Sequence, residues 1–246
     1  ANIIVVNDEP NGLNINHKAG SVYPKNLQSA VISHNADIGI AFDGDGDRVI
    51  MVDHNGTLVD GDQLLYLIMQ FYIKEGITFG GVVGTHMTNL AFEEKCKMQS
   101  IPFVRADVGD RYVSEELDRR KWILGGENSG HLLVKNLHST GDGIISALQV
   151  LSFLVKNKIS LKDALLDIKL YPQILINIPT ENKVNLKSKI IRDAIKESEI
   201  IMKGMGRTLI RPSGTQPLVR VMTEGPVKKE VMKAAKFLTR TIEELI

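Results

Sequence analysis

The chain has 246 residues, of which 43% are hydrophobic and 24% charged, and its formal net charge is +1. This composition is typical of a globular protein and excludes an intrinsically disordered one, which needs low hydrophobicity and a high net charge. Because the net charge is so small, no overall field attracts nucleic acid or an anionic membrane, and binding of anions depends on local clusters of side chains.

The sequence also bears on cellular location. Its longest apolar stretch, residues 64–73, is shorter than the roughly 18 residues that span a bilayer. Residues 1–6 lack the basic flank of a signal peptide and are predicted to form a strand. The single cysteine, Cys96, excludes an intrachain disulfide and fits a reducing compartment, and we expect it half-buried on a helix. We therefore predict a cytosolic protein with neither membrane nor nucleic acid among its partners.

The first region, residues 1–58, is predicted to be β-α-β-β. Its expected elements are a strand at 3–6, a helix at 27–33, strands at 37–42 and 48–53, and a turn at Asn55-Gly56. This is small for a complete sheet, so we expect the domain to be incomplete and a segment to precede it. Such a domain exposes apolar surface and a sheet edge, which predicts self-association.

The second region, residues 59–170, alternates strands with helices, which indicates an α/β layer. Its first helix, at 63–74, is apolar almost all round and is capped by Asp60 or Asp62. Further strands are expected at 81–84 and 103–106, and residues 121–124 lead into another. Further helices are expected at 89–98, 114–120 and 143–155, and one more begins at a capping box that starts with Ser160.

The third region, residues 171–246, follows the break at Tyr171-Pro172. The pattern predicts a strand at 173–178, a helix at 185–197, strands at 207–211 and 218–223, and a helix at 227–245. This arrangement is typical of a small α+β domain.

The sharpest signal is the loop Asp43-Gly44-Asp45-Gly46-Asp47-Arg48 between two predicted strands. In an extended chain alternate side chains project to one side, so three carboxylates converge there and need a divalent cation such as Mg²⁺ to neutralise them. An EF-hand is excluded, because Arg48 and His54 stand where it requires Gly and Glu. Arg48 is expected to face an anion shared with the metal, most plausibly a phosphate.

A second polar loop follows at Gly125-Gly126-Glu127-Asn128-Ser129-Gly130-His131. Its glycines predict a tight, exposed loop. If the loop is extended, Glu127 and Ser129 share one side and suit neighbouring hydroxyls of a sugar; a generic polar turn is the alternative.

A third loop, Arg211-Pro212-Ser213-Gly214-Thr215-Gln216-Pro217, joins two predicted strands and is followed by Arg220. Hydroxyls, backbone N–H groups beside a glycine and two arginines are the groups of a phosphate nest. The alternative is a β-turn with surface arginines. The sequence contains neither a Walker loop nor the glycine motif of a dinucleotide site.

These three loops, in this order, resemble the metal, sugar and phosphate loops of the α-D-phosphohexomutase superfamily. Three further stretches are similar to its phosphoglucosamine mutase family: residues 9–16, residues 108–113 and Thr140-Gly141-Asp142-Gly143. The resemblance covers essentially the whole chain.

The resemblance implies two α/β domains, at 1–58 and 59–170, the first incomplete, and a small TATA-binding-protein-like domain at 171–246. It implies conversion of a hexosamine phosphate, glucosamine 6-phosphate, to glucosamine 1-phosphate, with the phosphoryl group donated by a phosphoserine on a further, N-terminal domain. It also implies roles for single residues. Mg²⁺ is bound by Asp43, Asp45 and Asp47; Arg48 and Arg111 act at the transferring group; Glu127, Asn128, Ser129 and His131 hold the sugar; and Arg211, Ser213, Gly214, Thr215 and Arg220 grip the other phosphate.

The sequence departs from the family pattern at two points. Gln216 replaces a glutamate, and the Thr-Ala-Ser-His-Asn-Pro loop that carries the phosphoserine is absent. Ser33-His34-Asn35 echoes that loop only superficially, since it ends a predicted helix and continues with Ala36. The chain is thus expected to be inactive alone. A non-catalytic phosphosugar-binding module, or a mutase for mannose or glucose phosphate, remain the alternatives.

Overall fold

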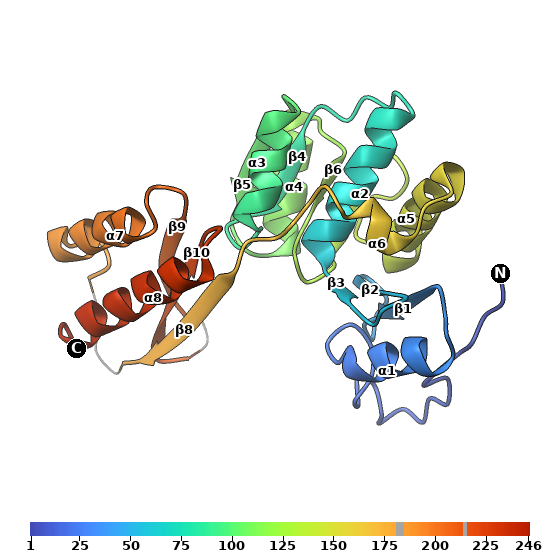
Figure 1. Cartoon of the computed structure of the whole chain (residues 1–246), viewed down its shortest axis with the longest axis horizontal. Coiled ribbons are helices and arrows are strands. Elements are labelled where there is room, and N and C mark those ends of the chain that lie inside the picture. Colours follow the sequence, from blue (N-terminus) through green and yellow to red (C-terminus); the bar gives the residue numbers. More distant parts are fainter. Residues whose placement is uncertain (181–184, 214–215) are drawn as a thin grey trace. The chain divides into compact units, whose positions relative to one another are not determined.

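A computed structural model describes residues 1–180, 185–213 and 216–246 (Figure 1). The described chain divides into two compact units, one of residues 1–88 and 92–169, the other of residues 89–91 and 170–246. The first unit groups the predicted first and second domains, and the boundaries given above stay predictions. Within the described residues no helix is long and apolar enough to cross a membrane.

The N-terminal part of the first unit is an antiparallel sheet covered by one helix. Helix α1 (Lys25–Ser33) precedes strands β1 (Ile38–Phe42), β2 (Val49–Asp53) and β3 (Leu58–Val59), which lie in the order β1-β2-β3. The predicted Asn55-Gly56 turn is confirmed: the Asp53 carboxylate accepts from the N–H groups of Asn55 and Thr57, and Gly56 has a φ of +79°. Strand β3, beyond this turn, was not predicted.

The strand predicted at residues 3–6 is wrong. In the described part of the chain these residues belong to no strand, and their side chains are exposed, Ile3 by 77%. Apolar, β-branched residues favour a strand only where a neighbour supplies hydrogen bonds, and here none is supplied.

The rest of the first unit is an α/β layer with strand order β5-β4-β6-β7. Strand β4 is parallel to β5 and β6, whereas β7 is antiparallel to β6. The connections through α3 and α4 run in opposite directions along the sheet, so the right-handed crossover rule places these helices on opposite faces. The strands are β4 (Val82–Thr85), β5 (Phe103–Ala106), β6 (Leu124–Gly126) and β7 (Leu132–Val134), and the helices are α2 (Gly61–Lys74), α3 (Leu90–Met98), α4 (Asp110–Arg120), α5 (Gly143–Asn157) and α6 (Leu161–Ala164).

Helix α2 is buried along most of its length, as its all-round apolar sequence predicted. Asp60, rather than Asp62, is its N-cap, and it forms a capping box with Gln63. Cys96 lies on α3 as expected, but it is fully buried instead of half-buried, with its Sγ atom 3.7 Å from Sδ of Met69. This burial raises the pKa of the Cys96 thiol to about 12.

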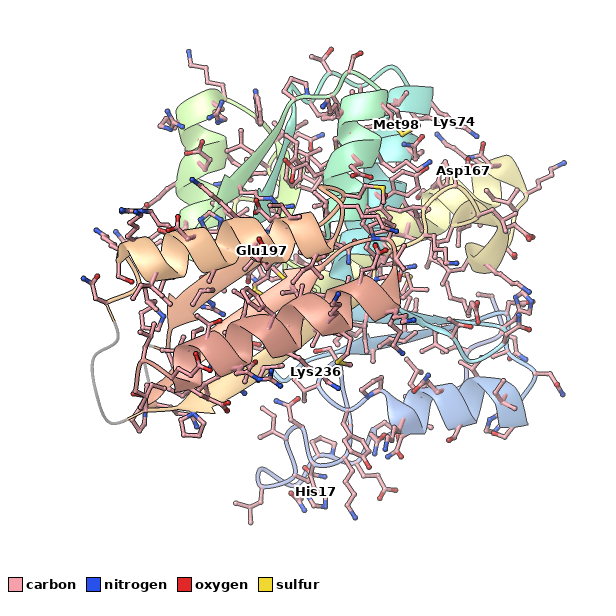
Figure 2. The ribbon with its side chains drawn as sticks, turned by 60° about the vertical axis from the view of Figure 1, so that its left-hand side comes forward. His17, Lys74, Met98, Asp167, Glu197 and Lys236 are labelled. Atoms are coloured by element: carbon pink, nitrogen blue, oxygen red, sulfur yellow. The ribbon has the colours of Figure 1, made fainter. Side chains whose placement is uncertain are left out.

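The second unit is an antiparallel sheet of order β8-β10-β9 with two helices, α7 and α8, lying side by side on it (Figures 1 and 2). Its core includes Val221 of the central strand and Leu238 of α8. The helix predicted at 185–197 begins later, because Ser188 caps it by accepting from the Ile191 N–H. The elements are β8 (Gln173–Pro179), α7 (Lys189–Ile201), β9 (Arg207–Pro212), β10 (Leu218–Glu224) and α8 (Lys228–Glu243).

The exposed apolar side chains near the N-terminus lead to a prediction about self-association. Besides residues 3–6, Leu13 is 91% and Ile15 67% exposed, and β1 has a neighbour on one side only. We expect the purified chain to associate at micromolar concentrations, because contiguous exposed apolar surface and an open sheet edge favour contact with a second chain. Sedimentation velocity over a concentration series tests this, and a single monomeric species at high concentration would contradict it.

Asp60 provides a prediction about pH. Burial, only partly opposed by hydrogen bonds from the N–H groups of Gln63 and Asp62, raises the pKa of Asp60 from 3.8 to about 6. The folded state therefore binds this proton more tightly than the unfolded state does, so ionisation of Asp60 lowers the free energy of unfolding as the pH rises from about 4 to about 6.

Replacement of Asp60 by Asn keeps an equally good N-cap and removes the ionisation. We expect the difference in unfolding free energy, wild type minus Asp60→Asn, to fall across that pH window and to be constant above it. Urea denaturation of both proteins at several pH values measures this difference. Asp60→Ala is the control: it also lacks the ionisation, so it should be less stable than Asp60→Asn by about 1 kcal/mol at every pH, through loss of the cap alone.

Candidate functional site

The acidic loop is a hairpin loop between β1 and β2. The register pairs Phe42 with Val49, so residues 43–48 form the connection. One oxygen each of Asp43, Asp45 and Asp47 lies within 4.8 Å of the others. The three carboxylates converge as predicted, but through a bend rather than in extended chain: the Gly46 N–H donates to the Asp43 carbonyl at 3.3 Å. A turn therefore brings together side chains that the sequence alone placed on one side of a strand.

The negative charges of the three carboxylates in this loop are only partly compensated by neighbouring side chains. Burial raises the pKa of Asp47, and the neighbouring Asp43 and Asp45 carboxylates add to this effect, whereas His131 opposes it. The Nε atom of Arg48 is 3.7 Å from Asp43 and 3.8 Å from Asp47, and it makes no hydrogen bond within the described residues. Three carboxylate oxygens at this spacing are the hard donor set that Mg²⁺ prefers, so the residues present fit the predicted cation.

The second polar loop joins β6 to β7 and lies directly against the acidic loop. Its bend is a turn in which the Gly130 N–H donates to the Glu127 carbonyl at 3.0 Å. The predicted exposure is wrong, since Glu127 is 8% and His131 only 2% exposed. The reason is tertiary packing: the backbones of Arg48 and His131 form a β-bridge, and the Val49 N–H donates to the Gly130 carbonyl at 3.0 Å.

A side-chain contact completes the junction of the two loops. The Nδ1 atom of His131 lies 3.0 Å from Oδ2 of Asp47. Gly130 allows the backbones of the two loops to come this close, because a Cβ atom there would lie 2.1 Å from the Val49 carbonyl oxygen. Its φ of +93° also favours glycine. The structure thus brings together residues that are 84 positions apart in sequence and that the sequence placed in separate loops.

The remaining residues of the second loop have different surroundings. Oε1 of Glu127 accepts from the Gly109 N–H at 3.0 Å, which ties the loop to the start of α4. The buried Oγ of Ser129 has no hydrogen-bond partner within the described ranges. The Asn128 carbonyl accepts from the Gly61 N–H at 3.1 Å, at the start of α2.

Arg111 lies in the first turn of α4, which begins at Asp110 rather than at the predicted Ser114. Its guanidinium is 81% exposed and forms an ion pair of 2.7 Å with Glu115 one turn later. The contact between Gly109 and Glu127 places this turn beside the second loop. Within the described residues Arg111 makes no hydrogen bond or ion pair with the acidic loop.

The third loop belongs to the second unit and joins β9 to β10. Arg211 and Arg220 are directly opposite each other on these antiparallel strands, and the buried Nε atom of each has no hydrogen-bond partner in the described part of the chain. The same holds for Oγ of Ser213. Like charges in facing positions destabilise a sheet. An anion bound between the two guanidinium groups would offset this repulsion. Gly214 and Thr215 lie outside the described residues.

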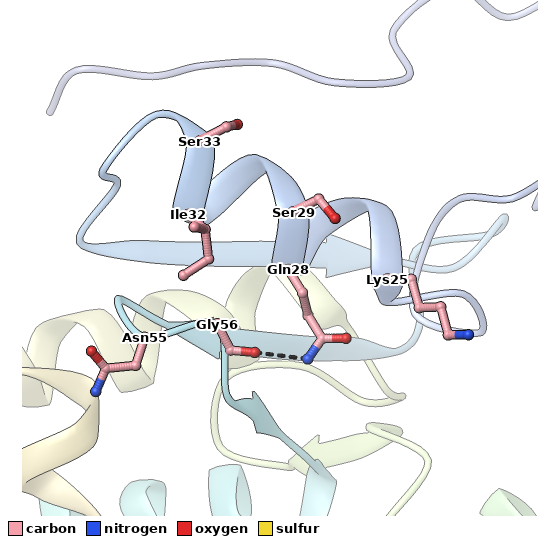
Figure 3. A pocket seen from close by; sticks show the side chains of 7 residues that line it. All are labelled: Lys25, Gln28, Ser29, Ile32, Ser33, Asn55 and Gly56. Atoms are coloured by element: carbon pink, nitrogen blue, oxygen red, sulfur yellow. Dashed lines mark hydrogen bonds between the residues drawn. The ribbon is translucent and has the colours of Figure 1, made fainter.

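Ser33, which echoes the phosphoserine loop, lies elsewhere. It lines a pocket between α1 and the β2–β3 turn, where Gln28 donates to the Gly56 carbonyl at 2.7 Å (Figure 3). Its hydroxyl donates to the carbonyl of Ala30 in its own helix. Ser33 has no contact with the acidic loop among the described residues.

Several residues of this junction were not predicted from the sequence as site residues. They are Gly109, Gly130, Gly141 and Gly143, whose hydrogen bonds or close approaches hold the loops together. The similarity of residues 108–113 and 140–143 to the family hinted at three of them, and Gly130 stood in the second polar loop without a role of its own.

Three models of one family match the chain in succession. The phosphoglucomutase/phosphomannomutase α/β/α domain II matches residues 2–56, domain III residues 60–171, and the C-terminal domain residues 175–240. The chain therefore belongs to the phosphoglucomutase/phosphomannomutase family, which confirms the predicted fold class.

Curated relatives narrow this assignment. The chain is 50% identical over 245 residues to the phosphoglucosamine mutase of Methylobacillus flagellatus, covering 99% of the chain and 54% of that protein. It is 47% identical over 246 residues to that of Proteus mirabilis, covering 100% and 55%. The chain is a phosphoglucosamine mutase homologue that spans about half the length of these relatives.

Solved structures share the fold at low sequence identity. Aspergillus fumigatus N-acetylphosphoglucosamine mutase, in complex with GlcNAc-6P and magnesium, matches with a TM-score of 0.75 and 21% identity, covering 94% of the chain and 53% of that protein. A phosphoglucomutase/phosphomannomutase family protein of Burkholderia thailandensis matches with a TM-score of 0.73 and 18% identity, covering 92% and 51%.

The repulsion within the acidic loop leads to a prediction about divalent cations. We expect Asp45→Asn to unfold at a higher temperature than the wild type in EDTA, because it removes one of three mutually repelling charges; the gain is at most about 1 kcal/mol. Added Mg²⁺ should raise the melting temperature of the wild type but not of the variant. Differential scanning calorimetry measures both effects.

Asp37→Asn is the matched control, since Asp37 is an exposed aspartate just before β1. It should respond to EDTA and Mg²⁺ as the wild type does. Equal stabilisation of Asp45→Asn and wild type by Mg²⁺ would show that the loop does not bind the cation.

Proposed function

We propose that this chain is the metal-, sugar- and phosphate-binding part of a phosphoglucosamine mutase. The reaction interconverts glucosamine 6-phosphate and glucosamine 1-phosphate by Mg²⁺-dependent phosphoryl transfer through a bisphosphate intermediate. The observation that carries this proposal is the contact between His131 and Asp47, because it joins the loop proposed to bind the sugar to the loop proposed to bind the cation. The identity to curated phosphoglucosamine mutases supports the substrate assignment.

Asp43, Asp45 and Asp47 are the residues that would hold Mg²⁺. When bound, the cation neutralises negative charge on the transferring phosphoryl group, which is the main demand of this chemistry. Arg48 adds a guanidinium whose Nε makes no hydrogen bond within the described residues. Arg111 is assigned to the transferring phosphoryl group as well. Its ion pair with Glu115 must open first, and because that pair is exposed to solvent it opposes the movement only weakly.

The second loop is proposed to hold the sugar. Oε1 of Glu127 is engaged by the Gly109 N–H, which leaves Oε2 as the acceptor for a sugar hydroxyl. The unpartnered hydroxyl of Ser129 supplies a second hydrogen bond, and Asn128 and His131 complete the set. A buried polar group without a partner is costly, and a ligand that satisfies it recovers that cost.

The third loop is proposed to bind the phosphate that does not react. Arg211 and Arg220 present two cations on facing strand positions, and Ser213 adds a hydroxyl. A phosphate dianion would offset the repulsion between the two guanidinium groups and accept hydrogen bonds from both. Gly214 and Thr215 keep their predicted role in this loop.

The phosphoryl donor of the reaction is a phosphoserine. The 246 residues contain no Thr-Ala-Ser-His-Asn-Pro sequence, and Ser33 lies apart from the acidic loop. We therefore propose that these residues catalyse turnover only together with a phosphoserine-bearing N-terminal domain, which is the predicted protein partner. A cytosolic location belongs to the same proposal.

A coupled assay of glucosamine 1-phosphate formation tests this function. The chain is assayed alone and with a separately expressed N-terminal domain of a relative, each with Mg²⁺ and a catalytic amount of sugar bisphosphate. We expect turnover only when both parts are present, and its loss in EDTA. Turnover by the chain alone would mean that the nucleophile has been misidentified.

Controls separate the alternatives. Arg220→Met keeps the size of the side chain, so it should raise KM for the sugar phosphate by at least 10-fold without abolishing Mg²⁺ binding. Faster turnover of mannose or glucose phosphate would exclude glucosamine phosphate as the preferred substrate. Saturable binding of glucosamine 6-phosphate without turnover in any mixture would instead identify a non-catalytic binding module.

A further inference from the structure

The segment Thr140-Gly141-Asp142-Gly143 lies against the acidic loop, although it follows the second loop in sequence. The Gly143 N–H donates to the Gly46 carbonyl at 2.9 Å, and the Asp142 carboxylate caps α5 by accepting from the Ile145 N–H at 2.8 Å. A Cβ atom on Gly143 would lie 2.8 Å from the Arg48 carbonyl oxygen and 2.9 Å from that of Gly46. The first residues of α5 are therefore fixed to the acidic loop.

Gly141 is in close contact with the imidazole of His131. A Cβ atom on Gly141 would lie 2.4 Å from both Cε1 and Nε2 of the ring, and 2.9 Å from Nδ1. These distances are shorter than any side chain tolerates, so a larger residue would displace the ring. The φ of Gly141 does not lie in the left-handed region, and its backbone conformation does not require glycine. The three atoms nearest to such a Cβ all belong to the ring, so the His131 imidazole sets the requirement for glycine.

The ring held in this way bonds to one member of the acidic loop. An ionised carboxylate only accepts hydrogen bonds, so Nδ1 of His131 carries the proton that it donates to Oδ2 of Asp47 at 3.0 Å. His131 is 2% exposed, and the β-bridge to Arg48 holds its backbone. Its imidazole is thus confined between Gly141 on one side and Asp47 on the other.

We propose that His131 and Gly141 are positioning residues that orient Asp47 for a divalent cation, with Gly141 acting by leaving the space that the His131 ring occupies. This inference rests on the proposed function, because it takes Asp47 as a metal ligand. Residues that hydrogen-bond to metal ligands orient them, and their loss typically weakens metal affinity by about 10- to 100-fold.

Mn²⁺ binding to the purified chain, measured by electron paramagnetic resonance, tests the proposal without any assay of activity. We expect Gly141→Ala to weaken Mn²⁺ binding by about 10- to 100-fold. His131→Asn should bind nearly as well as wild type, because its amide nitrogen can stand where Nδ1 stood. The double variant Gly141→Ala/His131→Asn should recover part of the lost affinity, since Asn lacks Cε1 and Nε2, the two ring atoms 2.4 Å from a Cβ at position 141, and keeps only a nitrogen near the Nδ1 position, 2.9 Å away.

Two further variants keep the test decisive. Gly225→Ala is the matched control, since its Cβ would meet no atom closer than 3.1 Å, and it should bind Mn²⁺ as the wild type does. His131→Leu removes the donor and leaves Gly141 unchanged, so it should lose as much affinity as Gly141→Ala. Circular dichroism shows whether Gly141→Ala folds. If it does not fold, the Mn²⁺ affinity of His131→Leu alone tests the positioning role.

The outcomes distinguish this inference from the proposed function. Unchanged Mn²⁺ affinity in His131→Leu, or a loss in Gly141→Ala that the double variant does not recover, would overturn the positioning role while the cation site stands. Failure of the wild type to bind Mn²⁺ would overturn the cation site and the positioning role together.

Discussion

The mutual repulsion of three carboxylates within 4.8 Å of one another is the constraint on which the first unit depends. Burial raises the pKa of Asp47 and thereby increases the cost of keeping the cluster ionised. The surrounding structure opposes this cost with fixed hydrogen bonds. The Arg48 N–H donates to Asp43 at 3.0 Å, the His131 ring bonds to Asp47, and the Gly143 N–H holds the loop backbone at Gly46. These bonds hold the three carboxylates in the positions that the proposed cation site requires.

All three polar loops join neighbouring antiparallel strands. The acidic loop joins β1 to β2, the second loop joins β6 to β7, and the third joins β9 to β10. A hairpin fixes both ends of its loop through the register of two strands, so a few polar side chains are held in place by a rigid scaffold. In the first unit two such hairpins meet end to end through Gly130, which explains why Glu127 and His131 of the second loop are buried.

Among the described residues, most buried side-chain atoms without a hydrogen-bond partner lie in or beside these loops. Within the described residues they include Nε of Arg48, Oγ of Ser129 and the facing arginines of the third loop. Each of them lowers the stability of the ligand-free protein, since buried donors and acceptors without partners and facing like charges are unfavourable. Their concentration at the loops that carry the proposed chemistry is the expected trade of stability for function.

The sequence by itself determined the elements with strong local signals: the buried helix α2, the Asn55-Gly56 turn, the strands around the acidic loop and the three loops that resemble the family. It left the cap of α2 open between Asp60 and Asp62. These follow from periodicity, capping and turn chemistry, which act over a few residues. Only the tertiary structure decided that residues 3–6 form no strand, that Glu127 and His131 are buried, and that Gly141 makes room for the ring bonded to Asp47. Strand pairing, burial and close approach depend on residues far apart in the chain, and no local pattern encodes their distances.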